Sequence, residues 1–303
     1  MKLYAPKYYT DFICIADRCT HSCCVGWEID VDSAAMQKYH SLPHGYGDTL
    51  RESIDTDGTP HFKLDKHDRC PHLNSKNLCK IILELGEDCL CDICREHPRF
   101  YNYSSLGREV GLGIACEEAC RIVLNSDSFE TVCIGTSSGD EYESEFDTVA
   151  LREKIYSILA DPALTHRDKL LKLQLEFDFS LSCITDSEVK DLIDSLEFLD
   201  ESHRDRFKAY SSEYEAPASL ERALERLLAY FVFRHCTEEC DENTYRASLG
   251  MCLFLTRLFA SVAANEKAES ERELIEIARM ISEEIEYSES NTEALKLEFL
   301  FRQ

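Results

Sequence analysis

The side chains best suited to chemistry in this sequence are cysteines, and they are crowded into its first part. Twelve of the sixteen cysteines lie within the first 133 of 303 residues. Among them are the adjacent pair Cys23-Cys24 and the Cys91-x-x-Cys94 spacing of a metal knuckle. Ordinary buried cysteines occur singly, so this crowding is typical of either a disulfide framework or a set of thiolate ligands for metal.

The rest of the sequence favours metal over disulfides. The first residues lack the apolar stretch and the small-residue cleavage site of a secretory signal. The longest apolar runs, such as residues 227–233, are far shorter than the roughly 18 residues that cross a membrane. We therefore expect a cytoplasmic protein without a membrane partner, in which thiols stay reduced and clustered cysteines bind metal.

Two kinds of metal centre suit these ligands. Four thiolates hold zinc in a tetrahedral site or one 4Fe–4S cluster. Zinc ribbons pair two CxxC knuckles, whereas this sequence has a single one. The spacing therefore favours an iron–sulfur cluster, with zinc as the alternative. Neighbouring side chains on an extended backbone point to opposite sides, so Cys23 and Cys24 could serve one centre or two.

The charge of the chain excludes some classes of partner. With 58 acidic and 33 basic residues, its net charge is −25. Such a chain is repelled by nucleic-acid backbones and by anionic membranes, so we predict neither as a partner. A diffuse acidic surface commonly serves solubility alone, but it also attracts lysine-rich proteins. The sequence carries no phosphate-binding loop, nucleophile elbow or HExxH motif that would indicate another chemistry.

The elements that must position the cysteines are short. Up to residue 134 the apolar periodicity is poor, and we predict only short helices at residues 32–40, 78–85 and 116–124. Residues 135–148 are small, polar and acidic, which predicts a loop or linker. The sequence therefore predicts a cysteine-rich metal-binding module with little regular structure over residues 1–134.

Beyond the linker, over residues 149–303, the helical signal is strong. Residues 219–236 and 273–287 place apolar side chains at i, i+3 and i+4 spacing, which is typical of amphipathic helices. Residues 247–264 are apolar on most faces and are predicted as a buried helix. The predicted fold is mainly α, with the cysteine-rich module followed by an α-helical domain.

Several short motifs, taken together, resemble one known family. They are Pro6 with Tyr8-Tyr9, Phe12-x-Cys14, Cys19, Cys23-Cys24 with Gly26-Trp27, Cys70-Pro71-x-Leu73, Leu78-Cys79-x-Ile81, Leu85-Gly86-Glu87, Cys94-Arg95 with Pro98-Arg99, and Cys116-x-Glu118-x-x-Arg121. Residues 230–235 and 285–288 resemble further segments of the same family. In these motifs the chain is similar to the flagellin lysine-N-methylase family, within a wider set of zinc- or iron-chelating proteins with a cysteine doublet.

The resemblance implies a methyltransferase that moves a methyl group from S-adenosylmethionine to lysine ε-amines of flagellin, or of another lysine-rich protein. It also implies an iron–sulfur cluster. Cys89, Cys91 and Cys120 depart from the family pattern. The resemblance therefore implies eight metal ligands, namely Cys14, Cys19, Cys23, Cys24, Cys70, Cys79, Cys94 and Cys116.

Other residues in or beside the matched motifs are candidates for the rest of the site. Trp27, Arg95 and Arg99 are candidates for cofactor binding, and Glu28 and Glu117 for the base that accepts the lysine proton. The same charged residues could instead form structural ion pairs. The sequence itself contains no recognisable methyl-donor site. The alternative function is a non-catalytic iron- or zinc-binding or scaffold protein that shares only the cysteine module.

The first prediction concerns the metal. We expect protein purified without oxygen to contain iron and acid-labile sulfide, because its reduced cysteines are crowded and irregularly spaced. Elemental analysis, a sulfide assay and a visible absorption that bleaches on reduction measure this. Stoichiometric zinc without sulfide would replace the iron–sulfur cluster by the zinc alternative and leave the cysteine ligands in place.

Overall fold

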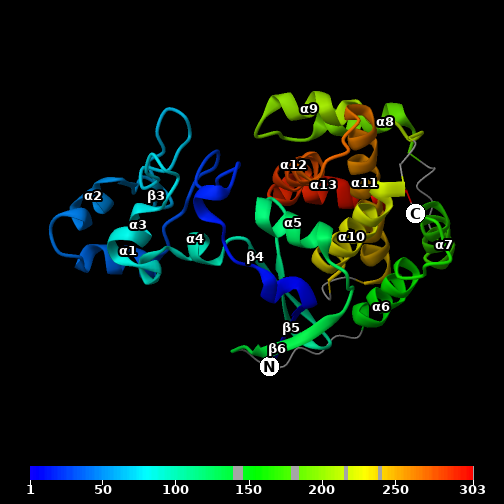
Figure 1. Ribbon diagram of the computed structural model, residues 1–303, viewed down its shortest axis with the longest axis horizontal. Coiled ribbons are helices and arrows are strands. Elements are labelled where there is room, and N and C mark those ends of the chain that lie inside the picture. Colours follow the sequence, from blue (N-terminus) through cyan, green and yellow to red (C-terminus); the bar gives the residue numbers. More distant parts are fainter. Residues whose placement is uncertain (139–145, 179–183, 215–217, 238–240, 303) are drawn as a thin grey trace. The chain divides into compact units, whose positions relative to one another are not determined.

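A computed structural model of the chain describes residues 1–138, 146–178, 184–214, 218–237 and 241–302. The chain forms two compact units, which Figure 1 shows. The cysteine-rich unit comprises Ile13–Arg99, and the helical unit comprises Met1–Phe12 together with Phe100–Gln303.

The cysteine-rich unit contains short elements joined by turns. Asp32 begins its first helix by accepting a hydrogen bond from the backbone N–H of Ala35, and Gly86 ends the third with a φ of 86°. The helices expected at residues 32–40 and 78–85 are confirmed. The elements are η2 (Ala16–Arg18), α1 (Ser33–Ser41), α2 (Tyr46–Glu52), the antiparallel pair β2 (Ile54–Asp55) and β3 (His61–Phe62), α3 (Lys80–Leu85), η3 (Glu87–Cys89) and α4 (Asp92–Glu96).

This unit has a small core of its own. Tyr39 on α1 is buried, and its hydroxyl donates to the carbonyl of Cys89 at 2.8 Å. Leu50 and Phe62 are buried in the same cluster. Cysteines make up part of this core, so the thiols lie among apolar side chains and not only on the surface. The buried members are Ile29, Val31, Ala35, Tyr39, Leu50, Ile54, Phe62, Cys70, Leu73, Ile81, Cys89 and Cys91.

The helical unit includes a four-stranded sheet that draws on distant parts of the chain. The strand order is β4-β5-β1-β6, with β1 parallel to β5 and antiparallel to β6. Because Leu3 pairs with both Arg108 and Gly135, the first residues of the chain belong to this unit. The strands are β1 (Lys2–Pro6), β4 (Arg99–Ser104), β5 (Gly107–Leu112) and β6 (Thr131–Thr136), with η1 (Lys7–Asp11) after β1.

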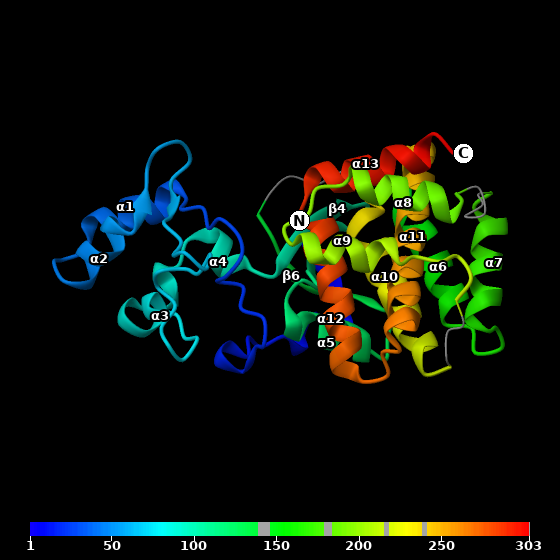
Figure 2. The same cartoon turned by 90° about the horizontal axis from the view of Figure 1, so that it is seen from above.

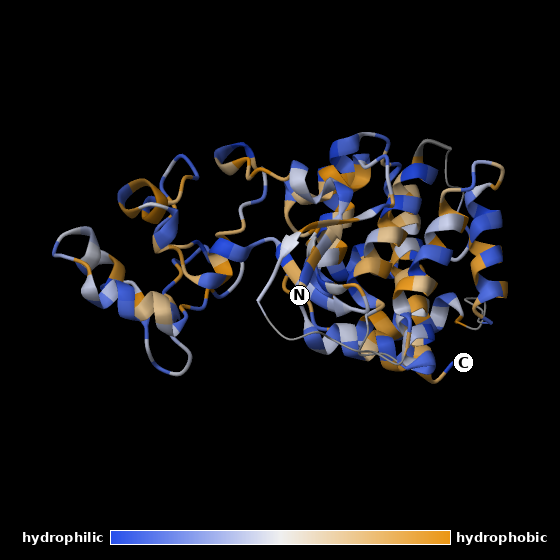
Figure 3. Ribbon diagram, turned by 90° about the horizontal axis from the view of Figure 1, so that it is seen from below, coloured by the Kyte–Doolittle hydropathy of each residue, from blue (hydrophilic) through white to orange (hydrophobic). Residues whose placement is uncertain are grey.

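The remaining helices pack around α11 (Glu242–Glu266), whose side chains are buried along most of its length. It contacts α9, α10, α12 and α13, as Figures 1 and 2 show. Apolar residues run along the helices of both units in Figure 3. The other helices are α5 (Glu117–Asn125), α6 (Thr148–Leu159), α7 (His166–Glu176), α8 (Asp186–Ser195), α9 (Glu201–Lys208), α10 (Ala218–His235), α12 (Glu271–Ile281), the π-helical turn η5 (Ser282–Glu286) and α13 (Glu289–Leu300).

The predicted fold class is confirmed, because helices predominate and strands are few. By length and composition α11 could cross a membrane, but 89% of its most apolar window is buried inside the helical unit. It is therefore the core helix that the apolar residues 247–264 predicted.

The two compact units divide the chain differently from the predicted domains 1–134 and 149–303. Strand β1 at the start of the chain lies in one sheet with β4, β5 and β6, and this sheet belongs to the same unit as the later helices. Sequence periodicity does not indicate the pairing of its strands. Within the predicted linker at 135–148, residues 139–145 lie outside the described residues. The predicted boundary therefore stays a prediction.

The close approach of β5 to an aromatic ring gives a stability prediction. A Cβ added at Gly111 would lie 2.2 Å from Cζ of Phe100, whereas a Cβ at Gly135 would meet nothing within 4 Å. We expect Gly111→Ala to lower the free energy of unfolding by about 1–3 kcal/mol through overpacking. The matched control Gly135→Ala should change it by less than about 0.5 kcal/mol. Denaturant titration compares the two, and equal effects would contradict the packing described here.

Candidate functional site

Six cysteines belong to the core cluster of the cysteine-rich unit. Five of them, all except Cys89, also influence one another electrostatically, and we call these five the cysteine group. Cys70 and Cys91 are buried, and the other three are partly buried against the same core cluster. The backbone N–H of Cys70 donates to the carbonyl of Cys24 at 2.9 Å, which links two distant segments. The members of the cysteine group are Cys24, Cys70, Cys79, Cys91 and Cys94.

The thiols of the cysteine group influence one another electrostatically. A hydrogen bond with Cys23 lowers the pKa of Cys24 to about 7, and a hydrogen bond with Cys94 lowers the pKa of Cys91. Burial, together with smaller contributions from the nearby thiolates, raises the pKa of Cys70 to about 12. Several thiolates can therefore coexist here only with a nearby positive charge, which is what a bound metal centre supplies.

The cysteine group contains only part of the predicted ligand set. Cys14 and Cys23 are exposed and Cys19 is partly buried in the segment that precedes the group, whereas Cys116 adjoins α5 in the helical unit. Among the residues that the structure describes, no three histidine, cysteine, aspartate or glutamate side chains are already arranged to hold one metal ion. The donor chemistry fits a thiolate-ligated cluster, and the centre itself stays a prediction.

Cys91 is a candidate ligand that the family resemblance left out. It is 1% exposed and contacts Cys94 through a hydrogen bond between the two side chains. The Cys91-x-x-Cys94 spacing was the sequence signal that could have included it.

The histidine within the Cys70-Pro71-x-Leu73 motif has a structural role. His72 is buried, its Nδ1 lies 2.7 Å from the Tyr46 hydroxyl, and its Nε2 lies 2.7 Å from the Ser53 hydroxyl. Burial lowers the pKa of His72 to about 4, so the ring is neutral. Because both ring nitrogens have partners, His72 is not placed to bind metal.

The predicted cofactor-binding residues all belong to the cysteine-rich unit. The indole N–H of Trp27 donates to the carbonyl of Cys23 at 2.8 Å, and its ring centroid lies 6.3 Å from that of His97. Arg95 pairs with Asp92 and Glu96 in the same helix, and Arg99 donates to the Arg95 carbonyl at 3.5 Å. Trp27 is thus attached to the cysteine doublet, whereas Arg95 forms local ion pairs.

The two predicted catalytic carboxylates belong to different units. Glu28 is exposed in the cysteine-rich unit, and its carboxylate lies 3.5 Å from Nε2 of His61. Glu117 is partly buried in the first turn of α5 in the helical unit, directly after Cys116. These two residues are therefore not one site within a single unit.

A buried polar cluster in the helical unit was not predicted, and we call it the Glu286 cluster. Glu286 ends η5 with a fully buried carboxylate. That carboxylate accepts hydrogen bonds from the Tyr230 hydroxyl at 2.9 Å, from Nε2 of His235 at 2.7 Å and from the Ser282 hydroxyl. Nε of Arg234 lies 3.3 Å from the same carboxylate. Ser282 of η5 and one face at the end of α10 thus converge on the Glu286 carboxylate.

The charges in the Glu286 cluster balance. Burial opposes ionisation of Glu286, but Arg234 and the hydrogen bonds from His235 and Ser282 outweigh it and lower the pKa of the carboxyl. Burial lowers the pKa of His235, so the imidazole is neutral and donates to the carboxylate. Glu286 and Arg234 therefore form an ion pair inside the helical core.

The Glu286 cluster extends to the surface near a predicted ligand. The Arg234 guanidinium lies 5.2 Å from the ring centroid of Tyr287, which is 45% exposed. Burial raises the pKa of the Tyr287 phenol, and the smallest of the further contributions comes from Cys116, which therefore lies near Tyr287. Residues 230–235 and 285–288, which resemble the same family, thus meet beside Cys116.

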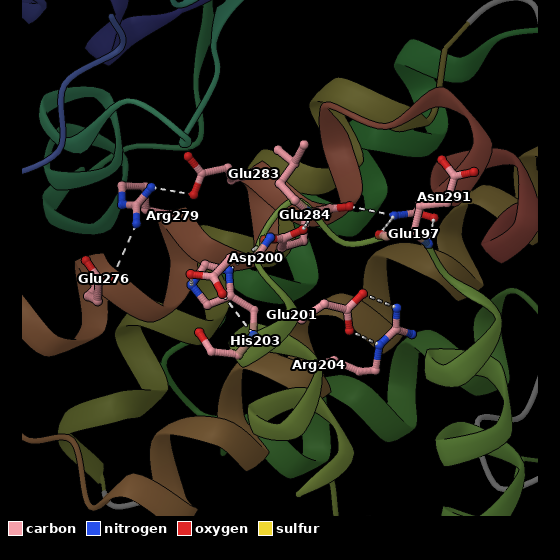
Figure 4. Close-up of polar contacts among 12 residues, drawn as sticks. Glu197, Asp200, Glu201, His203, Arg204, Glu276, Arg279, Glu283, Glu284 and Asn291 are labelled. Atoms are coloured by element: carbon pink, nitrogen blue, oxygen red, sulfur yellow. Dashed lines mark hydrogen bonds and ion pairs between the residues drawn. The ribbon is translucent and has the colours of Figure 1, made fainter. Parts of the chain in front are cut away.

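The neighbouring carboxylate of η5 faces another partner, as Figure 4 shows. Glu284 accepts hydrogen bonds from the backbone N–H groups of Leu199 at 2.7 Å and Asp200 at 3.1 Å, and lies 2.6 Å from Nδ1 of His203. Asn291 donates to the carbonyl of Glu284 at 2.7 Å. Glu284 therefore attaches η5 to the segment between α8 and α9, and its role is structural.

The chain is similar in sequence to known lysine N-methylases and to a flagellar protein. A model of the FliB lysine N-methylase C-terminal domain matches residues 105–301. The flagellar biosynthetic protein FliU of Salmonella muenchen is 25% identical over 163 residues, which cover 50% of this chain and 94% of that protein. The lysine-N-methylases of Salmonella choleraesuis and Salmonella typhimurium are each 28% identical over 134 residues, which cover 40% of this chain. The matches span only 32% of each of these two methylases. No solved structure matches this chain.

The composition of the cysteine group gives a test by substitution. We expect Cys91→Ser to lose most of the iron that the wild-type chain binds, because its thiol belongs to the cysteine group. Cys133→Ser is the control, since Cys133 is exposed on β6 of the helical unit and should keep wild-type iron. Iron and sulfide per chain are measured on anaerobically purified variants. Wild-type iron in Cys91→Ser would restrict the ligands to the eight predicted cysteines.

Proposed function

This chain belongs to the FliB lysine N-methylase family, and we propose that it transfers methyl groups to lysine ε-amines of a protein substrate. The observation that carries the proposal is the family match over residues 105–301, which include the whole Glu286 cluster. We further propose that S-adenosylmethionine is the methyl donor, that flagellin is the substrate and that the reaction takes place in the cytoplasm.

The chemistry sets two requirements for such a site. A lysine amine attacks a methyl group only after it has lost its proton, and the donor must lie in line with it. The net charge of −25 attracts a cationic lysine but also stabilises its ammonium form. A base in a less polar setting is therefore needed to accept the proton.

Glu117 meets the requirement for a base better than Glu28 does. Glu117 is partly buried, lies within the residues matched by the family and follows Cys116, which neighbours Tyr287. Glu28 is exposed and lies outside the matched residues. We propose Glu117 as the group that accepts the lysine proton. The Glu286 cluster would hold Arg234 and Tyr287 in place beside it.

The proposed iron–sulfur centre belongs to the cysteine-rich unit. Its ligands would come from the cysteine group, with Cys24 and Cys91 as the thiols that ionise most readily there. When bound, such a centre would supply an iron that can bind the methyl donor. Alternatively, it would stabilise the fold by linking the short elements of the unit.

The decisive experiment incubates anaerobically purified protein with S-adenosylmethionine and flagellin and measures lysine mass shifts of one methyl group. We expect methylation by the wild type, and a loss of at least about 100-fold in kcat for Glu117→Gln, as is typical when a general base is removed. Glu28→Gln is the matched control and should keep most of the activity. Equal activity of both variants would contradict the role of Glu117.

The alternative function is a metal-binding or scaffold protein without catalysis. Absence of any mass shift with metal-replete protein and several flagellins would favour it. If Cys23→Ser and Cys24→Ser each leave the rate of methyl transfer unchanged, the cysteine doublet is not required for the chemistry.

A further inference from the structure

The helical unit contains a recess that the proposed function does not use. The centres of water-sized spheres fit into only about 20 Å³ of it, and the wider space of about 310 Å³ includes open solvent. The recess therefore has room for one small polar group and opens outward. It lies where η1, the residues after α5, α6 and α10 meet. Its lining combines aromatic rings with one cation. Its lining includes Ser128, Phe129, Tyr156, Arg226 and Tyr230.

Arg226 on α10 is the unusual member of this lining. Its Nε and Nη1 are buried, and neither has a hydrogen-bond partner within the described chain. Its guanidinium carbon lies 4.0 Å from the centroid of the Phe129 ring, which in turn stacks on Tyr156 with centroids 5.6 Å apart. Guanidinium donors lie in the plane of the group, so stacking on Phe129 leaves them free to meet a ligand.

Three of the other polar groups of the recess already have partners. The Tyr156 hydroxyl donates to the carbonyl of Ala229 at 3.1 Å, and the Tyr230 hydroxyl donates to Glu286. The Ser128 hydroxyl oxygen accepts from the backbone N–H of Glu130 at 3.0 Å. Nε and Nη1 of Arg226 are buried without a partner within the described chain, and a buried donor without an acceptor is costly. A ligand for this recess must supply an acceptor.

The surrounding charges select the kind of acceptor. Arg226 is the one charged residue among those described that line the recess. The nearby charges are those of Arg222, Glu225 and Asp127. Arg222 donates to the Ser126 carbonyl at 3.3 Å, and Glu225 pairs with Lys169. One cation in a chain with a net charge of −25 favours a monoanion over a dianion such as phosphate.

We propose that this recess binds the carboxylate of a small molecule. The carboxylate accepts hydrogen bonds from Nε and Nη1 of Arg226, and the rest of the molecule extends toward the side of the recess that opens to solvent. Arginine and carboxylate form strong, charge-assisted hydrogen bonds, which satisfy the donors that the chain leaves unmatched.

Two sources could supply such a carboxylate. One is the methyl donor, because S-adenosylmethionine carries a carboxylate, and Tyr230 lines the recess while also bonding to Glu286. This first source rests on the proposed function. The other is an unrelated small carboxylic acid, which would bind whether or not the protein is a methyltransferase.

Isothermal titration of the full-length chain with three probes separates these sources. S-adenosylhomocysteine carries both a nucleoside and a carboxylate, 5′-methylthioadenosine lacks the carboxylate, and butyrate lacks the nucleoside. If the donor occupies the recess, S-adenosylhomocysteine binds more tightly than methylthioadenosine. If another carboxylic acid occupies it, butyrate binds and the carboxylate of S-adenosylhomocysteine adds nothing. Either result supports the carboxylate site, and neither depends on methyl transfer.

Substitutions assign the binding to the recess. We expect Arg226→Gln to weaken carboxylate binding by at least about 10-fold, because it removes a charge-assisted hydrogen bond. Arg246→Gln is the matched control, since Arg246 pairs with Glu242 on α11 and does not line the recess. Arg226→Lys keeps the charge without the stacking and gives an intermediate loss, which tests the site even if the glutamine variant fails to fold. The proposal is overturned if no carboxylate binds or if both Arg226 variants bind as the wild type does.

Discussion

The arrangement of the helical unit depends on burying the Glu286 carboxylate. A buried carboxylate is tolerated only when a cation and hydrogen-bond donors surround it. Here the cation is Arg234, and the hydrogen-bond donors are Tyr230, His235 and Ser282. The end of α10 and the turn η5 must therefore face each other. Packing around α11 brings them into reach, and Glu284 and Glu286, which are two residues apart in η5, contact different partners.

This constraint connects the features that bear on function. Arg234 lies between Glu286 and the exposed ring of Tyr287, which neighbours Cys116. Tyr230 extends from the same cluster to the recess that contains Arg226. The family match covers all of these residues, which is why the catalytic base and the carboxylate site are both proposed in the helical unit.

The cysteine-rich unit differs from the helical unit in having thiols in its core. Its helices and strands are short, and its core includes the thiols of Cys70, Cys89 and Cys91. Thiols that are buried together resist ionisation unless a cation is present. The unit thus has a core that can fold around its apolar residues, and a group of sulfur donors that can ionise together only beside a cation.

The sequence by itself determined the helical class, the position of the buried helix α11 and the crowding of cysteines, because periodicity and spacing are local properties of the chain. Only the tertiary structure decided that Cys91 joins Cys24, Cys70, Cys79 and Cys94 in one group. It also decided that Tyr230 and Glu286, which are 56 residues apart, share a hydrogen bond. Contacts over such separations depend on how whole helices and strands pack, and no local pattern of residue types specifies that packing.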